Sequence, residues 1–430
     1  MRPSICDRLC GRFGVAVVCV VLAWPLASSA RVYTLDECIA TALANNTALA
    51  SAQAGLDGAR ADVMSSWSGV LPRVSAGLSE SDQLVVAEGI ETSSTGVNGN
   101  VSLSQVLFDG STFASISGSQ HSRAASEASL EATRRSVVLG ARQGYYGLLK
   151  AVQLRDVAAE AVDLAREQLR KTQSLFDLGS ASRSDLLKAE VQVAQQELNL
   201  ITAEKNAATA RAGLCYAIGI DVTTELEAVD PAPEQAEEAV LDFDLDEAVA
   251  RRPDIRSQEE MLVAAQRSLL AAKAAWWPDL SLSISYGRYK ESMDDFWDDL
   301  SDDYSRAVTL NLSVPIFDGL ATVAGVSRAN ANLRSYELAL KDARLAAAYE
   351  IETARLSVQE QRSRVATAEK ALANAEEDLR VSEERFRLRS ASMLELIDAR
   401  TAYSRSKAEL VQARYDHEAA KAELKTALGL

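Results

Sequence analysis

Proline is missing from residues 73–230 and from residues 316–430, so neither tract contains the residue that most readily breaks a helix. Apolar residues recur there at every seventh position, the spacing of helices that pack as left-handed coiled coils. We call each such line of residues a heptad seam. The clearest heptad seams are Ile351, Val358, Val365, Leu372, Leu379 and Phe386, then Leu186, Val193, Leu200, Ala207 and Leu214, and finally Leu396, Tyr403, Leu410, His417 and Leu424. The pattern predicts helices over 111–178 and 320–388, each about 100 Å long at about 1.5 Å per residue. Helices of this length must bury their apolar stripes on neighbouring helices.

The two tracts are related copies of one pattern. The segment VSLSQVLFDG (101–110) returns as LNLSVPIFDG (310–319), and LFDLGSASRSDLLKAE (175–190) returns as RFRLRSASMLELIDAR (385–400). Both echoes are separated by about 210 residues, a period too long for a short-repeat solenoid. The steady offset predicts a tandem duplication of one helix–strand–strand–helix unit.

The duplication and the composition divide the chain into four segments. Residues 1–30 combine arginines, an apolar stretch and small residues before position 31, the pattern of a cleaved export signal, with a retained anchor helix as the alternative. The two repeats are expected over 31–220 and 244–430. Between them, residues 221–243 are rich in acids and contain prolines, which predicts an exposed connector.

Composition argues against several classes of function. The formal net charge of −16 does not suit a nucleic-acid partner. The sequence has no glycine-rich phosphate loop, no Ser-His-Asp set and no metal-ligand spacing, so we expect no enzyme, no cofactor and no metal site. Beyond residue 30 only Cys38 and Cys215 remain, and we expect two free buried thiols, with a disulfide as the alternative.

Four short segments alternate apolar and polar residues with the two-residue period of half-apolar strands. They lie at 74–79, 101–107, 280–286 and 308–316. The pattern fits a small soluble antiparallel sheet, or strands with lipid on one side and water on the other. Trp67, Trp276 and Trp277 stand where helix gives way to strand, the place of an interfacial aromatic belt. Together with the export signal, they favour the membrane reading.

Four strands cannot close a membrane barrel, because known barrels have at least about eight. The chain must therefore assemble with copies of itself, and the strand count leaves dimer, trimer and tetramer open. The loops between the strands are expected at 84–96 and 290–304. The second loop is strongly acidic, which favours a solvated outer loop over a calcium site.

The long proline-free helices, the duplication, the paired FDG turns and the GSASRSDLLKA turn resemble the TolC-type outer-membrane efflux proteins (outer membrane factors) over the whole chain after the signal. The resemblance implies an α+β membrane protein, a trimer with four strands per chain that builds a transmembrane β-barrel and a long α-helical coiled-coil barrel. It implies export of small molecules or proteins across the Gram-negative outer membrane, in a tripartite efflux or type I secretion system. An exported structural coiled-coil protein without a pore is the alternative.

The resemblance also implies partners: a homotrimer, a periplasmic adaptor (membrane fusion) protein, an inner-membrane pump of RND, ABC or MFS type, and outer-membrane lipid. Adaptors of the family dock at two helix–helix turns. By position these turns are Leu178, Gly179, Ser180 and Ala181, and Leu388, Arg389, Ser390 and Ala391. The family usually has Gly where Arg389 stands, and its entrance latch of Tyr and Arg is replaced here by Phe386 and Ala391. We therefore expect the entrance of this chain to be held closed by other residues.

Asp398 matches, position for position, the acid that narrows the tunnel entrance in the family. In a trimer three copies of Asp398 would converge around the axis and attract cations. Asp185 and Glu395 each follow a serine by three residues, so a capping box at a helix start is the favoured reading of both. The candidate constriction is thus Asp398, together with Glu395 and Asp185 if they also point inward, and the pore is expected to select cations.

Overall fold

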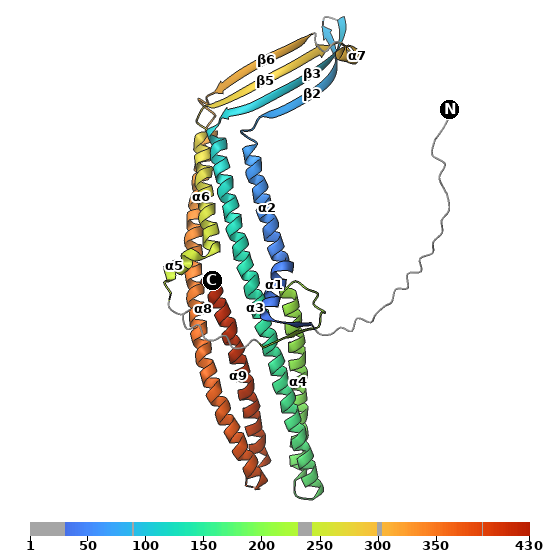
Figure 1. Cartoon of the computed structure of the whole chain (residues 1–430), viewed down its shortest axis with the longest axis vertical. Helices are drawn as coiled ribbons and strands as arrows, with labels where there is room; N and C mark the ends of the chain where they lie inside the picture. The colour runs from blue at the N-terminus through green and yellow to red at the C-terminus, as the bar shows by residue number, and fades with distance from the viewer. Residues whose placement is uncertain (1–30, 88–89, 231–242, 299–302, 389) are drawn as a thin grey trace, which may run out of the picture.

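The computed structural model describes residues 31–87, 90–230, 243–298, 303–388 and 390–430, so the export signal expected over 1–30 lies outside the described residues. The molecule is elongated, with a sheet at one end and long helices running away from it (Figure 1). The helices are α1 (Leu35–Asn45), α2 (Thr47–Trp67), α3 (Gly110–Asp177), α4 (Arg183–Ala217), α5 (Leu245–Arg251), α6 (Pro253–Ala274), α7 (Met293–Trp297), α8 (Ala321–Arg387) and α9 (Met393–Ala427). The strands are β1 (Arg31–Tyr33), β2 (Arg73–Ala87), β3 (Ile90–Phe108), β4 (Leu226–Ala228), β5 (Asp279–Lys290) and β6 (Tyr304–Ser313).

The two longest helices confirm the prediction from the proline-free tracts. Helix α3 has 68 residues and α8 has 67, and each begins and ends within one residue of the expected bounds. The heptad seams are buried at the positions nearest their partner helices, for example Ile351 and Val358 in α8 and Leu396, Leu410 and Leu424 in α9. Among the described residues, no helix is both long enough and apolar enough to cross a membrane.

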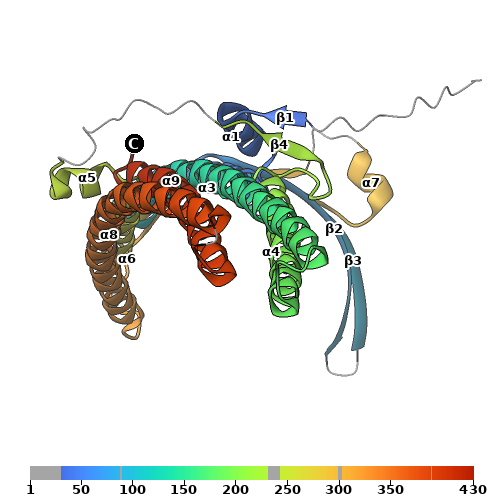
Figure 2. The same cartoon turned by 90° about the horizontal axis from the view of Figure 1, so that it is seen from below.

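The long helices stand side by side in an arc (Figure 2). Helix α3 packs against α2 and α6 near the sheet and against α4 and α9 further away, while α8 packs against α6 and then α9. The short elements α1, β1, β4 and α5 lie on the convex side of the arc. One edge of the arc is therefore α2 followed by α4, and the other edge is α8.

Each FDG turn joins a strand to one of the two longest helices, as the sequence predicted. Asp109 caps α3, because its carboxylate accepts a hydrogen bond from the Ser111 amide at 2.9 Å. In the second copy the Asp318 carboxylate accepts one from the Thr322 amide at 2.7 Å. Gly319 adopts a left-handed backbone with φ of 66°, which glycine tolerates best.

The four longer strands form one antiparallel sheet in the order β2-β3-β5-β6. The hairpin of β2 and β3 is longer than expected: Ala87 pairs with Ile90, so most of the loop predicted at 84–96 belongs to paired strands. The alternation that marks the strands fades there, and hydrogen bonding between the strands continues without it. The second loop has the expected bounds but contains the short helix α7.

Two apolar cores hold the helices together, one in each half of the chain. In the first, Tyr145 of α3 is fully buried and its hydroxyl donates to the carbonyl oxygens of Tyr33 and Val229. These carbonyls flank a parallel pair of strands, β1 and β4. The described residues 221–230 of the expected connector are exposed or half-buried with one exception, Leu226, which this pairing buries. Residues 231–242 of the expected connector lie outside the described residues.

Cys38 of α1 and Cys215 of α4 belong to the same core and are free, buried thiols, as predicted. Burial, followed by the nearby charges of Glu37 and Cys215, raises the pKa of the Cys38 thiol to about 11. Only a thiolate reacts readily with an alkylating reagent.

We therefore expect neither thiol to react with a maleimide in the folded protein at neutral pH, and both to react after denaturation without reductant. Mass spectrometry of the labelled protein measures this. A chain that stays unlabelled after denaturation, and takes up two labels only after reduction, would contradict the free-thiol assignment.

Candidate functional site

The end of the molecule far from the sheet consists of two helix–helix turns (Figure 1). In the first turn Gly179 has φ of 72°, and the amides of Ser180 and Ala181 both donate to the Leu175 carbonyl oxygen, at 2.7 and 3.1 Å. This arrangement closes α3 with a left-handed residue, as glycine commonly does after a helix. Leu178 is 78% exposed, so the tip presents an apolar side chain to its surroundings.

The second turn, at the end of α8, shares one of these hydrogen bonds and the exposed leucine. The Ser390 amide donates to the Arg385 carbonyl oxygen at 2.8 Å, and Leu388 is exposed like Leu178. Ala391 is half-buried, and Arg389 lies outside the described residues. The structure thus brings the remaining residues of the two predicted docking turns to the same end of the molecule.

Asp185 and Glu395 both interact with the serines that precede them. Ser182 and Asp185 form a complete capping box: the Asp185 amide donates to the Ser182 hydroxyl at 3.1 Å, and the Ser182 amide donates to the Asp185 carboxylate at 3.2 Å. The Glu395 amide donates to the Ser392 hydroxyl at 3.2 Å, and the Glu395 carboxylate lies 3.6 Å from Arg385. The capping box that the spacing favoured is therefore complete at Asp185, whereas at Glu395 only the serine half of the box is present.

Asp398 is different, because it lies further into α9. Its side chain is exposed and has no hydrogen-bond or ion-pair partner among the described residues. The buried neighbours Leu396 and Ala399 fix the rotation of α9, so the carboxylate faces away from the packed helices. Of the three candidate acids, Asp398 is the one without a partner among the described residues.

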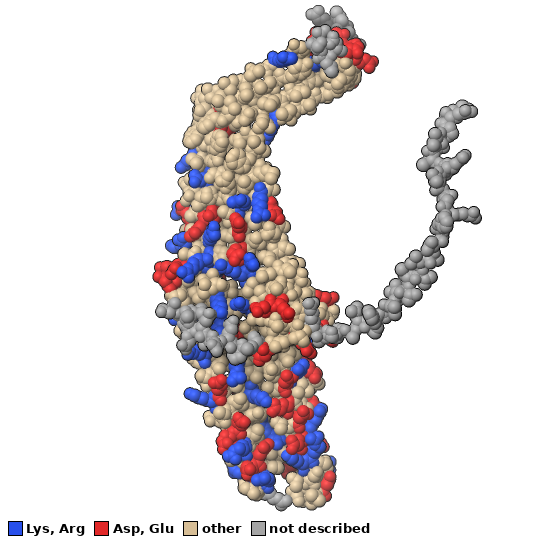
Figure 3. Space-filling model, viewed as in Figure 1, with Lys and Arg blue, Asp and Glu red and all other residues tan. Residues whose placement is uncertain are grey.

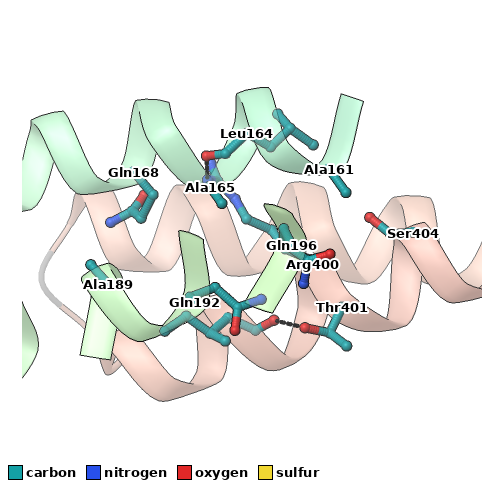
Figure 4. Close-up of a pocket in the computed structure, with 11 residues that line it drawn as sticks. Ala161, Leu164, Ala165, Gln168, Ala189, Gln192, Gln196, Arg400, Thr401 and Ser404 are labelled. Atoms are coloured by element: carbon teal, nitrogen blue, oxygen red, sulfur yellow. Dashed lines mark hydrogen bonds between the residues drawn. The ribbon is translucent and has the colours of Figure 1, made fainter. Parts of the chain in front are cut away.

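Arg400 joins the two helix pairs, a role that the sequence reasoning missed. From α9, its Nη1 donates to the Leu164 carbonyl oxygen of α3 at 3.0 Å, and its Nη2 lies 2.7 Å from the Glu383 carboxylate of α8. Figure 4 shows this guanidinium beside a small pocket lined by α3, α4 and α9. The side chain is only 13% exposed. Arg400 stands four residues after the seam residue Leu396, which is the one sequence signal that it lies beside the interface.

Further polar contacts continue the junction between α3 and α9. Gln168 Nε2 donates to the Met393 sulfur at 3.3 Å near the turns, and Lys150 lies 2.7 Å from Asp416 nearer the middle. Lys407 pairs with Glu160 between them. These contacts give the two helix pairs a defined relative position.

The three tryptophans that were predicted to form an aromatic belt lie at the opposite end of the helices. Trp67 is the last residue of α2, and Trp276 and Trp277 follow the end of α6, all three at least partly exposed. A Cβ atom at Gly110 would lie 2.5 Å from the Trp277 ring, so the glycine of the first FDG turn makes room for this ring. The three tryptophans thus stand where the helices meet the sheet.

A four-stranded sheet continued by long antiparallel helix pairs is the protomer architecture of outer-membrane channel proteins. The solved CmeC outer membrane channel of Campylobacter jejuni superposes with a TM-score of 0.83 and 20% identity, covering 92% of this chain and 85% of that one. The sequence profile described as "Outer membrane efflux protein" matches residues 38–220 and 245–430. The chain belongs to this family.

Two curated relatives give the range of similarity. Protein CyaE of Bordetella pertussis is 31% identical over 204 residues, which is 47% of this chain and 43% of that protein. The probable efflux pump outer membrane protein TtgC of Pseudomonas putida is 26% identical over 392 residues, which is 87% of this chain and 78% of that protein. The match to CyaE therefore spans less than half of that relative.

Replacing Arg400 with Ala removes a hydrogen bond and an ion pair from a largely buried junction. We expect a loss of about 2 kcal/mol in unfolding free energy, since hydrogen bonds to charged groups contribute about 1.5–3 kcal/mol. Amide hydrogen exchange should rise in α9 and in the facing part of α3. The matched control is Arg414→Ala, which removes an exposed pair with Glu369 and is expected to cost less than about 1 kcal/mol. Equal effects of the two variants would show that Arg400 does not join the helix pairs.

Proposed function

We propose that three copies of this outer membrane efflux protein form a channel through which small molecules, or proteins, leave the periplasm. In this proposal a periplasmic adaptor protein docks at the two turns, and an inner-membrane pump of RND, ABC or MFS type supplies the cargo. The chain acts as a conduit and carries no catalytic group of its own. The proposal keeps the division into a signal (1–30), two repeats (31–220 and 244–430) and a connector (221–243).

The observation that carries the proposal is the difference between the two faces of the sheet. On one face, register places apolar side chains next to one another across all four strands: Val74, Leu78, Val101, Leu103, Leu280, Leu282, Ile284, Val308, Leu310 and Leu312. The other face carries small polar residues, and the Ser75 and Ser102 hydroxyls lie 2.8 Å apart on it. Figure 3 shows the sheet almost free of charge between its outer tip and the helices. Lipid on one face and water on the other explains this division.

The edges of the molecule support assembly with further copies. Strands β2 and β6 are the two edges of the sheet, and an edge strand offers unpaired backbone groups to another chain. The edge helices also expose apolar side chains at helical spacing. These are Leu187, Val191, Leu198 and Ile201 on α4, and Leu338, Leu345, Tyr349 and Leu356 on α8. A ring in which each α8 edge meets the next α2–α4 edge buries both.

The runner-up, an exported structural coiled-coil protein without a pore, does not account for the sheet. A structural coiled-coil protein explains the heptad seams of the helices. It does not explain an exposed apolar sheet face that includes Val308, Leu310 and Leu312. A monomer would leave that face in water, where exposed apolar patches of this extent favour association. Ion conduction separates the two readings directly.

We expect the purified trimer to conduct ions in planar bilayers and to prefer cations, because three Asp398 carboxylates would lie close together at the entrance. The variant Asp398→Ala should lose most of this preference and most of the block by multivalent cations added from the periplasmic side. Reversal potentials in a salt gradient measure the selectivity.

The control is Asp185→Asn, which alters a carboxylate already bound to its own helix start. It should reduce selectivity less than Asp398→Ala. Absence of any conductance would contradict the channel itself, whereas conductance with unchanged selectivity in Asp398→Ala would place the constriction elsewhere.

Gly179 tests the docking turns. A Cβ atom at this position meets no other atom within 4 Å, so a larger side chain projects outward rather than into the chain. We expect Gly179→Trp to abolish crosslinking to the adaptor and to abolish efflux while trimers still assemble. The matched variant Gly179→Asn should retain both activities, because Asn tolerates the left-handed backbone without the bulk. Normal efflux with Gly179→Trp would refute the assignment.

A further inference from the structure

Helix α7 lies on one particular face of the sheet. Phe296 of α7 is buried, and a Cβ atom at Gly99 of β3 would lie 2.3 Å from its ring. Side chains alternate along a strand, so the missing Cβ of Gly99 points to the same side as Val101 and Leu103. The ring therefore covers the apolar face of the sheet. In Figure 2, α7 lies on the outer side of the curved sheet, away from the concave side of the arc.

The apolar face ends at the level of α7. On β5 the apolar residues give way to Arg288, on β6 to Arg306, and on β2 to Glu80. Arg288 pairs with Gly99 across the strands, so this charged margin passes directly beneath Phe296. Aromatic rings also gather there, since the Arg306 guanidinium lies 4.6 Å from the centre of the Tyr304 ring.

Contacts to the sheet hold α7 in this position. The Arg288 guanidinium lies 5.7 Å from the centre of the Phe296 ring, and Arg288 donates to the Asp298 carbonyl oxygen just after the helix. The Ser292 hydroxyl accepts from the Asp295 amide at 3.2 Å at the start of the helix. Trp297 meets Phe296 edge to face at 5.2 Å and remains 61% exposed. Its ring is thus fixed at its base and open to the surroundings.

We propose that α7 is a membrane-surface anchor, in which Trp297 inserts at the boundary between headgroups and acyl chains of the outer leaflet. The proposal rests on the proposed function, because it takes the apolar face as the lipid-facing one. Tryptophan suits that boundary because its ring is apolar and its N–H is polar. It follows that α7 itself leaves the channel exit free, since this helix lies on the lipid side of the sheet.

The dimensions agree with an anchor at the outer surface. Between Trp277 and Arg288, β5 and its approach span about 36 Å at about 3.3 Å per residue. A strand tilt of about 40° reduces this to about 28 Å across the membrane, close to the apolar band of about 25 Å in outer-membrane proteins. The tryptophans below the sheet and Trp297 above it therefore stand at the two margins of one band.

Fluorescence quenching by brominated lipid tests the anchor. In the full-length trimer, Trp67, Trp276 and Trp277 are replaced by Phe, which leaves Trp297 as the emitting tryptophan of the mature chain. The protein is reconstituted into phosphatidylcholine vesicles with bromine either near the headgroup or near the chain end. We expect shallow bromines to remove most of the Trp297 emission and deep bromines to remove much less. Quenching by aqueous iodide, without quenching by either lipid, would overturn the proposal.

Two tryptophans placed in the same background, with Trp297→Phe, calibrate the result. Ile284→Trp lies in the middle of the apolar face and should be quenched by deep bromines. Tyr289→Trp lies on the serine face, over Gly96, and should respond only to iodide. If Ile284→Trp escapes lipid quenching, the membrane assignment of the sheet fails. If Ile284→Trp is quenched and Trp297 is not, only the anchor fails.

A second measurement covers the case in which the multiple replacement does not assemble. Trp297→Cys in the otherwise unchanged chain accepts a nitroxide label, since Cys38 and Cys215 are buried. Relaxation of this label by oxygen should exceed relaxation by a water-soluble nickel chelate, and the reverse order would contradict the anchor.

Discussion

The apolar stripes of the long helices impose the constraint on which the rest of the structure depends. A helix of 68 residues cannot bury its stripe on itself, so α3 needs partners along its whole length. It finds α2 and α6 near the sheet, and α4 and α9 beyond them. Helix α3 runs from the sheet to the first helix–helix turn and contacts both halves of the chain. Its length therefore fixes the distance between the sheet and the two turns. The two turns and the sheet are therefore separated by the length of one helix.

Local periodicity is the part of the fold that the sequence could predict. The heptads and the missing prolines determined α3 and α8 to within a residue, and the FDG turns marked their starts. The long β2–β3 hairpin escaped prediction because its outer half keeps the backbone ladder without the alternation. The pairing of β1 with β4 escaped because strands of three residues leave no period, and their contact joins distant parts of the chain.

At the candidate site, too, the sequence predicted local features but not those that depend on tertiary packing. Capping by Asp185 and Glu395 followed from a serine three residues earlier, a purely local signal. Arg400 gave only a weak signal, its position four residues after Leu396. That spacing does not show whether water or another helix covers the side chain. Its burial depends on where α3 crosses α9, and that crossing is decided by packing along the entire helix. Polar contacts between helix pairs are therefore visible only once the tertiary structure is known.

The two helix pairs, α3 with α4 and α8 with α9, share a sequence pattern, but the fold places them in different surroundings. Helix α4 packs chiefly on α3 and forms an edge of the arc, whereas α9 packs on both α3 and α8 and lies within it. The sequences have diverged accordingly: Lys188 of α4 stands where α9 has Asp398. An acid at both positions would place further like charge at the same end of the chain, and like charges repel. The acid therefore lies on the helix between α3 and α8, its counterpart on the edge helix is a base, and the two equivalent positions of the chain carry opposite charges.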